Sequence, residues 1–226
     1  MTATTAWRAE EVAEGTWVLS GPQDDLPAGA VPTEDDLRQA RGLPRWRAEE
    51  FTASRAVLRR LLRQVRADLV DAAVRKDRRG RPVLDGYPGV GISVSHDGGT
   101  IAAAVGPGRR VGVDVQLPPE RLPDALIRRC LRDRAPQVSA LPEPGRSTEF
   151  ARVWTVQEAC VKAEGTGLAG SPWTIDVEPG RARGRWGPYR WVSLRRSPIP
   201  LSCAFTDLKT DLKTDPETDL ETDLER

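Results

Sequence analysis

Residues 90–116 read VGISVSHDGGTIAAAVGPGRRVGVDVQ, and the fold class follows from this stretch. It predicts three short strands, separated by turns at residues 97–99 and 106–108, where glycine and proline interrupt the apolar pattern. Tight turns connect antiparallel strands, whereas parallel strands need long crossovers. We therefore expect an antiparallel meander over these residues.

Elements of both kinds flank this stretch. We expect a strand at residues 15–21, GTWVLSG, and a helix from about residue 46 to residue 70 with apolar residues on one stripe. After it, the pattern predicts helices over 122–133 and 148–166, then strands in TIDVEP (174–179), YRWVSLRR (189–196) and IPLSCAF (199–205). A helix with antiparallel strands thus occurs twice. The sequence predicts an α+β fold of two similar halves, residues 1–109 and 110–205.

The end of the chain differs from the rest. Residues 206–226 read TDLKTDLKTDPETDLETDLER, with 3 basic and 8 acidic residues and no aromatic side chain. Such a segment buries little apolar surface, so we expect a disordered acidic tail outside the fold. Residues 1–205 then hold 31 basic and 25 acidic residues. This arginine-rich excess is compatible with an anionic ligand, or simply with solubility.

Composition excludes several classes of protein. The chain of 226 residues has no run of 18 apolar residues and no signal-peptide pattern, so we expect no membrane span. Three cysteines without a CxxC pair argue against disulfides and zinc, and they favour the cytoplasm. One histidine leaves carboxylates as metal ligands, which suit Mg²⁺ or Mn²⁺. The basic stretches lack interleaved aromatics, which disfavours nucleic-acid binding.

The segment VGVDVQ (111–116) predicts a strand with two different faces. Its three valines point into a core, whereas Gly112, Asp114 and Gln116 share the other face. Asp114 and Gln116 are either an oxygen-ligand pair aimed at a metal or part of an exposed sheet face. The pattern alone does not separate the two.

The segment WTVQEACVK (154–162) predicts a largely buried helix, because apolar side chains lie on several of its sides. Thr155, Glu158 and Lys162 form a narrow polar strip, roughly 60° wide at 100° per residue. Charges are rarely buried without a partner. We expect Glu158 and Lys162 to line a cleft, with an internal ion pair as the alternative. Cys160 is expected to be a core residue.

Three further residues have two interpretations each. Ser95 and His96 end a strand before a turn, where they could bind an anion or simply shape the turn. Arg55 lies at the edge of the apolar stripe, where it either covers the core with its stem or contacts a ligand.

Taken together, five segments resemble the 4′-phosphopantetheinyl transferases. They are SRAVLRRLL (54–62), GRPVL (80–84), SVSH (93–96), VGVDVQ (111–116) and FARVWTVQEACVKAEGTGL (150–168). The likeness covers roughly residues 45–175, and the two halves resemble the monomeric Sfp type in particular. It implies the fold of that family, with an active site at the interface of the halves.

The resemblance also implies a reaction. The phosphopantetheine arm of coenzyme A moves to a serine of an apo acyl or peptidyl carrier protein, in polyketide or nonribosomal peptide biosynthesis, and adenosine 3′,5′-bisphosphate leaves. By the family pattern Asp114, Gln116 and Glu158 hold Mg²⁺, Glu158 accepts the serine proton, and Lys162 contacts the pyrophosphate. The residues matching coenzyme A contacts are Arg55, Arg81, Ser95, His96 and Lys162, to which Arg45 or Arg47 could add.

Two departures from the family pattern stand out. Many relatives have an acid at Gln116 and a lysine at Gln157, so metal affinity or turnover could be lower here. The alternative is therefore a weakened homologue that binds coenzyme A or a carrier protein. A carboxylate-metal phosphohydrolase is a third reading with little support.

Overall fold

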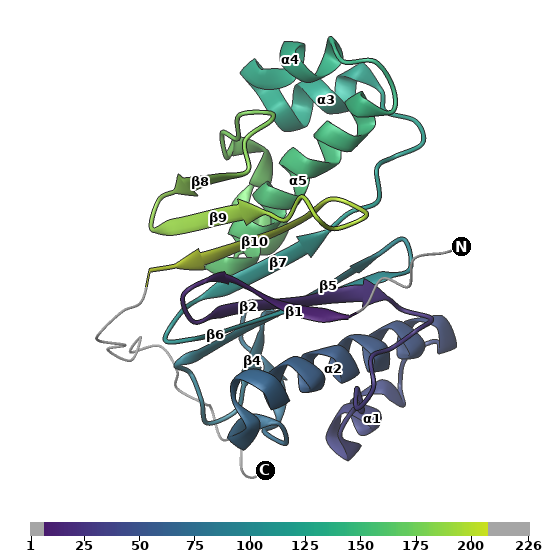
Figure 1. Ribbon diagram of the computed structural model, residues 1–226, viewed down its shortest axis with the longest axis vertical. Helices are drawn as coiled ribbons and strands as arrows, with labels where there is room; N and C mark the ends of the chain where they lie inside the picture. Colours follow the sequence, from purple (N-terminus) through teal and green to yellow (C-terminus); the bar gives the residue numbers. More distant parts are fainter. Residues whose placement is uncertain (1–6, 208–226) are drawn as a thin grey trace, which may run out of the picture.

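The computed structural model describes residues 7–207, which form an α+β fold with two sheets (Figure 1). The N-terminal sheet is antiparallel, in the order β1 (Arg8–Ala13), β2 (Thr16–Pro22), β6 (Thr100–Pro107), β5 (Val90–Asp97). Helix α2 (Arg45–Val65) lies along this sheet, with α1 (Glu34–Ala40) beside it. A small hairpin, β3 (Val74–Lys76) and β4 (Pro82–Leu84), completes this half.

The C-terminal sheet has the order β7 (Val111–Val115), β10 (Leu201–Thr206), β9 (Tyr189–Ser193), β8 (Arg183–Trp186). Helix α5 (Gly145–Glu164) packs on it, and α3 (Asp124–Leu131) and α4 (Ala135–Ser139) lie beyond that helix (Figure 1). Each half is thus one sheet with one long helix.

The two long helices bury their apolar faces in different ways. Helix α2 has a stripe of fully buried leucines, Leu58, Leu61 and Leu62, facing the first sheet. Helix α5 is buried on several sides, as its sequence predicted, because α3, α4 and the second sheet surround it. It ends at Gly165, whose left-handed backbone (φ 85°) lets its amide bond back to the last turn.

The two sheets face each other through a shared core. From β6 come Ala102 and Ala104, which are small enough for close approach of the second sheet. The three valines of β7 lie in the same core, which confirms the predicted facing of VGVDVQ. The opposite face of β7 is thereby turned toward α5.

The expected three-stranded meander is wrong at its second turn. Strands β5 and β6 pair around residues 98–99, but β7 pairs with β10 in the other sheet. Strand β5 still runs beside β7, because the hydroxyl oxygens of Ser93 and Ser95 accept the amides of Val113 and Val115, at 3.0 and 3.4 Å. Serine side chains therefore replace a backbone ladder where the halves meet.

Other expectations differ from the structure in detail. Residues 174–179 form no strand: Ile175 and Val177 are buried in a loop against the α5 core, so alternating burial occurs without a partner strand. Helix α2 ends at Val65, before residue 70. Thr206, assigned to the tail by its sequence, is the buried last residue of β10. The rest of the expected disordered tail, residues 208–226, lies outside the described residues. No helix within residues 7–207 is long and apolar enough to cross a membrane.

Candidate active site

Three predicted residues meet where the two halves touch. Asp114 is on β7, Lys162 on α5 and Ser95 on β5. The Lys162 Nζ atom donates to Asp114 Oδ1 at 2.7 Å, and the Ser95 hydroxyl donates to the same oxygen at 2.9 Å. Lys162 Nζ also lies 3.0 Å from Ser95 Oγ and 3.3 Å from the Val113 carbonyl. The structure thus brings together residues that are 67 positions apart in the chain.

Gly112 makes this meeting possible. A Cβ atom at residue 112 would lie 2.1 Å from the Ala159 carbonyl oxygen and 2.5 Å from the Ala163 amide nitrogen. Real side chains do not approach backbone so closely, so only glycine lets α5 lie directly on β7. This close contact brings Lys162 next to Asp114, the residue that follows the fully buried Val113 in β7.

Glu158 lies one turn before Lys162 and is half-buried. Its Oε1 atom is buried and has no hydrogen-bond partner within the described residues. Burial raises the pKa of this carboxyl, the negative charge of Asp114 raises it further, and Lys162 opposes both effects. A nearby cation would therefore stabilise the charged form of the Glu158 carboxylate.

Asp114 is also electrostatically perturbed. Burial raises its pKa, while Lys162 and the Ser95 hydroxyl oppose that rise. The internal ion pair expected as an alternative, between Glu158 and Lys162, is not formed within residues 7–207, because Lys162 pairs with Asp114 instead. Thr155, the third residue of the predicted strip, is fully buried and bonds Ser202 and the Arg152 carbonyl. Thr155 therefore faces the sheet rather than an open cleft.

The two glutamines occupy different environments. Gln116 Nε2 donates to Asp97 Oδ2 at 2.8 Å, and that oxygen also accepts the Leu117 amide at 2.6 Å. Gln157 is buried and donates to the carbonyls of Cys130 and Ile175, at 3.0 and 2.9 Å. Gln157 therefore ties α5 to its own half and does not face Asp114. The contact with Asp97 was not expected, although the sequence places this acid directly after Ser95 and His96.

Arg55 is held in a buried cluster on α2. Arg59 binds Asp36 with two contacts, at 2.9 and 3.0 Å, while Arg55 Nε lies 3.6 Å from Asp36 Oδ1 and its guanidinium stacks 4.8 Å from the centre of the Phe51 ring. The Nε and Nη1 atoms of Arg55 are buried and have no hydrogen-bond partner among the described residues, and burial lowers the pKa of Arg55. Its side chain is only 5% exposed. Both interpretations of Arg55 are therefore compatible with the structure. Its stem lies in the core, and two of its donor nitrogens form no hydrogen bond within residues 7–207.

Asp36 was missed by the sequence analysis. Thr33 caps α1 and bonds to Asp36, which is the third helical residue. The spacing T-x-x-D is a capping-box signal, which predicts the start of a helix here. It does not predict that the same carboxylate reaches two arginines of α2.

The remaining predicted anion-binding residues lie on separate sides of the site. Arg81 pairs with Asp77 at 3.1 Å and packs beside Gly165, where a Cβ would lie 3.4 Å from it. Arg81 thus belongs to the first half but reaches the end of α5. His96 points away from Ser95, as alternate strand residues do, and its Nδ1 lies 3.8 Å from Glu50 Oε2. The structure does not bring His96 into the cluster of Ser95, Asp114 and Lys162.

The donor set of the site suits a hard cation. Asp114 and Glu158 offer carboxylate oxygens, and Glu158 Oε1 is buried and unsatisfied. No group of three or more His, Cys, Asp or Glu residues within residues 7–207 is arranged to hold a metal by itself. Magnesium commonly binds through one or two carboxylates plus phosphates and waters, so these residues fit it. Cys160 is fully buried, and burial raises the pKa of its thiol, as expected of a core residue.

Comparisons with known proteins identify the family to which the chain is similar. Residues 110–188 match a family described as the 4′-phosphopantetheinyl transferase superfamily, and residues 34–106 match the 4′-phosphopantetheinyl transferase N-terminal domain. The chain is 30% identical over 167 residues to the 4′-phosphopantetheinyl transferase HetI of Nostoc sp. (strain PCC 7120 / SAG 25.82 / UTEX 2576), covering 67% of each protein.

Proposed function

The chain belongs to the 4′-phosphopantetheinyl transferase superfamily and acts on carrier proteins, and from this premise we propose that Asp114, Glu158, Lys162 and Ser95 form its active site. One observation carries the proposal: Glu158 Oε1 is buried without a hydrogen-bond partner in residues 7–207, and the charge of Asp114 is near enough to raise the pKa of Glu158. A buried charge without a partner is costly, so the presence of Glu158 here favours a ligand-binding role.

The proposed reaction transfers the phosphopantetheine arm of coenzyme A. The carrier serine oxygen forms a bond to the phosphorus that bears pantetheine, and the bond from that phosphorus to the bridging pyrophosphate oxygen breaks. The electron pair leaves with adenosine 3′,5′-bisphosphate, and the serine proton passes to a base. Such a reaction depends on positioning and charge neutralisation more than on covalent catalysis.

We propose that Asp114 and Glu158 hold Mg²⁺, with the amide oxygen of Gln116 as a third protein ligand. When bound, the ion supplies neutralisation of the pyrophosphate charge. Ser95 orients Asp114 by donating to Oδ1, and the Val115 amide donates to Ser95 in turn. The hydrogen bond from Gln116 Nε2 to Asp97 fixes the position of the amide. Because the amide is neutral, its oxygen attracts a cation less strongly than a carboxylate oxygen would.

Glu158 has the environment of a general base. Burial and the charge of Asp114 raise its pKa, and a base is most effective when its pKa approaches the working pH. Glu158 would accept the serine proton directly or through one water. Lys162 carries a positive charge one turn away, and it would donate hydrogen bonds to the leaving pyrophosphate oxygens.

Coenzyme A carries a pyrophosphate and a separate 3′-phosphate, so it needs further cations. We propose that Arg81, beside the end of α5, contacts the pyrophosphate, and that His96 contacts the 3′-phosphate. We propose Arg55 as a third anion contact on the family pattern, since its Nε and Nη1 atoms are themselves buried beside Asp36. Arginine suits this role because its planar fork matches phosphate oxygens. We further propose that the protein is a monomer and serves polyketide or nonribosomal peptide carriers, as its Sfp-like form implies.

The decisive experiment measures carrier mass. The purified protein is incubated with coenzyme A, Mg²⁺ and a panel of apo carrier proteins, and each carrier is weighed by mass spectrometry. We expect one phosphopantetheine to be added, no addition in EDTA, and restoration by excess Mg²⁺. If coenzyme A binds while no carrier gains mass, the assignment of an active site is wrong and a binding homologue remains.

A further inference from the structure

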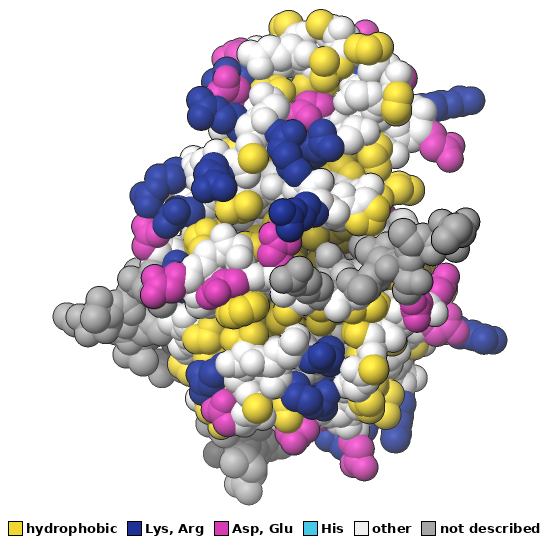
Figure 2. Space-filling view, in the orientation of Figure 1, with side chains coloured by type: hydrophobic (Ala, Val, Ile, Leu, Met, Phe, Trp, Pro, Cys, Tyr) yellow, Lys and Arg dark blue, Asp and Glu magenta, His cyan; other side chains and the backbone are white. Residues whose placement is uncertain are grey.

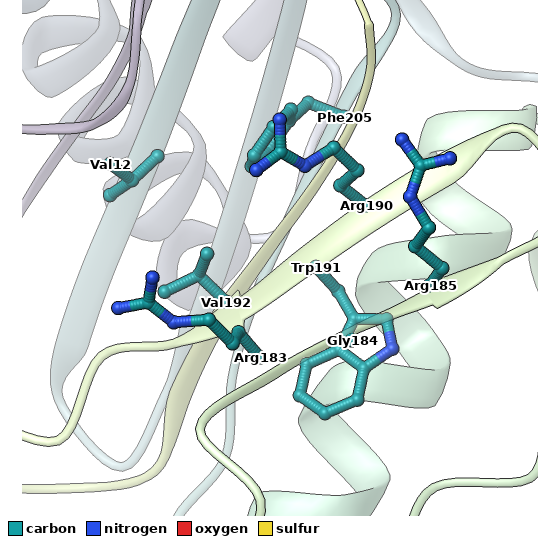
Figure 3. Close-up of a pocket in the computed structure, with 8 residues that line it drawn as sticks. All are labelled: Val12, Arg183, Gly184, Arg185, Arg190, Trp191, Val192 and Phe205. Carbon is teal, nitrogen blue, oxygen red and sulfur yellow. The ribbon is translucent and has the colours of Figure 1, made fainter.

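A cavity of about 310 Å³ lies on the C-terminal sheet, separate from the proposed active site (Figure 3). Phe205 lines it and pairs with Val111 at one end of β7, whereas Asp114 pairs with Ser202 near the other end. Phe205 faces the core between the sheets, whereas Asp114 faces α5. The cavity and the active site therefore lie on opposite faces of this sheet.

The cavity combines an apolar floor with a basic rim. The floor consists of Val12, Val192 and Phe205. Arg183, Arg185 and Arg190 form the rim; Figure 3 shows Arg190 across Phe205, with its guanidinium carbon 5.9 Å from the ring centre. Figure 2 shows basic side chains gathered over β8 and β9. This arrangement suits a ligand that offers carboxylates and small apolar groups together.

The chain itself already places one carboxylate at this rim. Asp207 is 2.6 Å from Arg185 and 3.4 Å from Arg190, and its hydrogen bond with Arg185 lowers its pKa. Arg183 forms no ion pair within residues 7–207, so the rim has spare positive charge.

The sequence after Asp207 is rich in acidic residues and leucines, which complement the basic rim and apolar floor of the cavity. Residues 208–226 contain 7 acidic and 3 basic residues. The triplet Thr-Asp-Leu occurs at 206–208 and recurs at 210–212, 218–220 and 222–224. Each triplet places a carboxylate beside a leucine, and the first of them already positions its Asp207 carboxylate at the rim.

We propose that the acidic tail, residues 208–226, docks in this cavity, with repeat carboxylates on Arg183, Arg185 and Arg190 and leucines on the apolar floor. Exposed ion pairs are individually weak and are screened by salt. A short tether nevertheless gives an effective concentration on the order of millimolar, so weak contacts suffice. The inference does not depend on the reaction assigned to the active site.

The positions of lysine make this testable in the full chain. The lysines are Lys76, Lys162, Lys209 and Lys213, so a lysine-specific protease cuts the tail at two sites close to Asp207. The measurement is the cleavage rate at Lys209 and Lys213 by mass spectrometry. The test variant is Arg183→Gln/Arg190→Gln, and the matched control is Arg121→Gln/Arg128→Gln, which removes two exposed arginines elsewhere.

At low salt we expect the wild type and the control to be cut at equal rates and the test variant to be cut about fivefold faster or more. Added salt should raise the wild-type rate toward that of the test variant. A second variant, Asp211→Asn/Asp215→Asn/Asp219→Asn/Asp223→Asn, leaves residues 7–207 unchanged. Its cleavage, normalised to that of the matching free peptide, should also be faster. Equal rates for the wild type and both variants at every salt concentration would overturn the proposal.

Discussion

The two long helices each bury a cluster of charged groups, and the clusters have opposite imbalances. On α2, two arginines share one carboxylate: Arg59 and Arg55 both approach Asp36, and two Arg55 nitrogens form no hydrogen bond within residues 7–207. On α5, two carboxylates share one cation: Lys162 pairs with Asp114, and Glu158 Oε1 has no hydrogen-bond partner in the described part of the chain. One cluster has surplus donors, which suit a phosphate. The other has surplus acceptors, which suit a metal ion.

The comparison suggests that the buried charges of one cluster stabilise the fold and those of the other bind a ligand. The Arg59–Asp36 pair is fully buried and has two mutual contacts, and Arg59 also donates to the carbonyls of Val70 and Ala72. Every part of that pair has a partner, so it contributes to the fold of the first half. Glu158 Oε1 has no hydrogen-bond partner within residues 7–207, so we expect Glu158 to cost stability until a ligand binds. The following predictions break one cluster at a time.

The largest effect is expected from Glu158→Gln. The variant keeps the shape of the side chain but removes its charge, and we expect turnover to fall about 10²–10⁴-fold from loss of the proton-transfer role alone. Folding stability should be unchanged or higher, because an unpaired buried charge is gone. Turnover is measured by carrier mass, and stability by urea unfolding in EDTA. Glu164→Gln, on the same helix, is the control that should retain activity. Wild-type turnover in Glu158→Gln would contradict the assignment.

The second largest effect is expected on folding stability rather than on turnover. Asp36→Asn leaves Arg59 and Arg55 buried without a counter-ion, and we expect the free energy of unfolding to fall by about 3–5 kcal/mol. Urea unfolding checks this. The matched control is Asp35→Asn in the same turn, which pairs with Arg38 and Arg75 near the surface and should cost about 0–1 kcal/mol. Equal losses for the two variants would show that the buried cluster has no special role.

The smallest effect is a difference in pH dependence. Despite burial, bonds to Arg59 and Thr33 hold the pKa of Asp36 below 3.8, so its stabilisation is present above that pH and is lost as the pH falls through the lowered pKa. The pKa of Glu158 is raised above 4.5, so the protein loses stability as the pH rises from 4.5 through the raised pKa.

Unfolding in EDTA between pH 3 and pH 7 tests both signs. The stability gap between wild type and Asp36→Asn should shrink at the acid end. Relative to Glu158→Gln, the wild type should lose stability toward the neutral end. A wild type that gains stability relative to Glu158→Gln as the pH rises would show that the Glu158 carboxylate is already well paired.

Local pattern predicted much of the second half. Helical periodicity identified α5 and its burial, and strand alternation placed Asp114 on the face opposite the valines of β7. The same reasoning failed at residues 174–179, where alternation reflects a loop packed on α5. Alternation of apolar and polar residues indicates which side chains are buried. A β-strand also needs a neighbouring strand for hydrogen bonding, and the local sequence does not show whether one is present.

By itself, the sequence determined the α+β class, the two repeated helix–sheet units, the placement of Asp114 opposite the valines of β7, and the spacing of Glu158 and Lys162 one turn apart on α5. These properties depend on residues only a few positions apart, whose geometry the backbone period fixes. Only the tertiary structure decided that β7 leaves the first sheet, that Ser95 bonds Asp114, and that Asp36 serves both arginines of α2. Those contacts join residues about 20 or more positions apart, and packing of whole elements selects them.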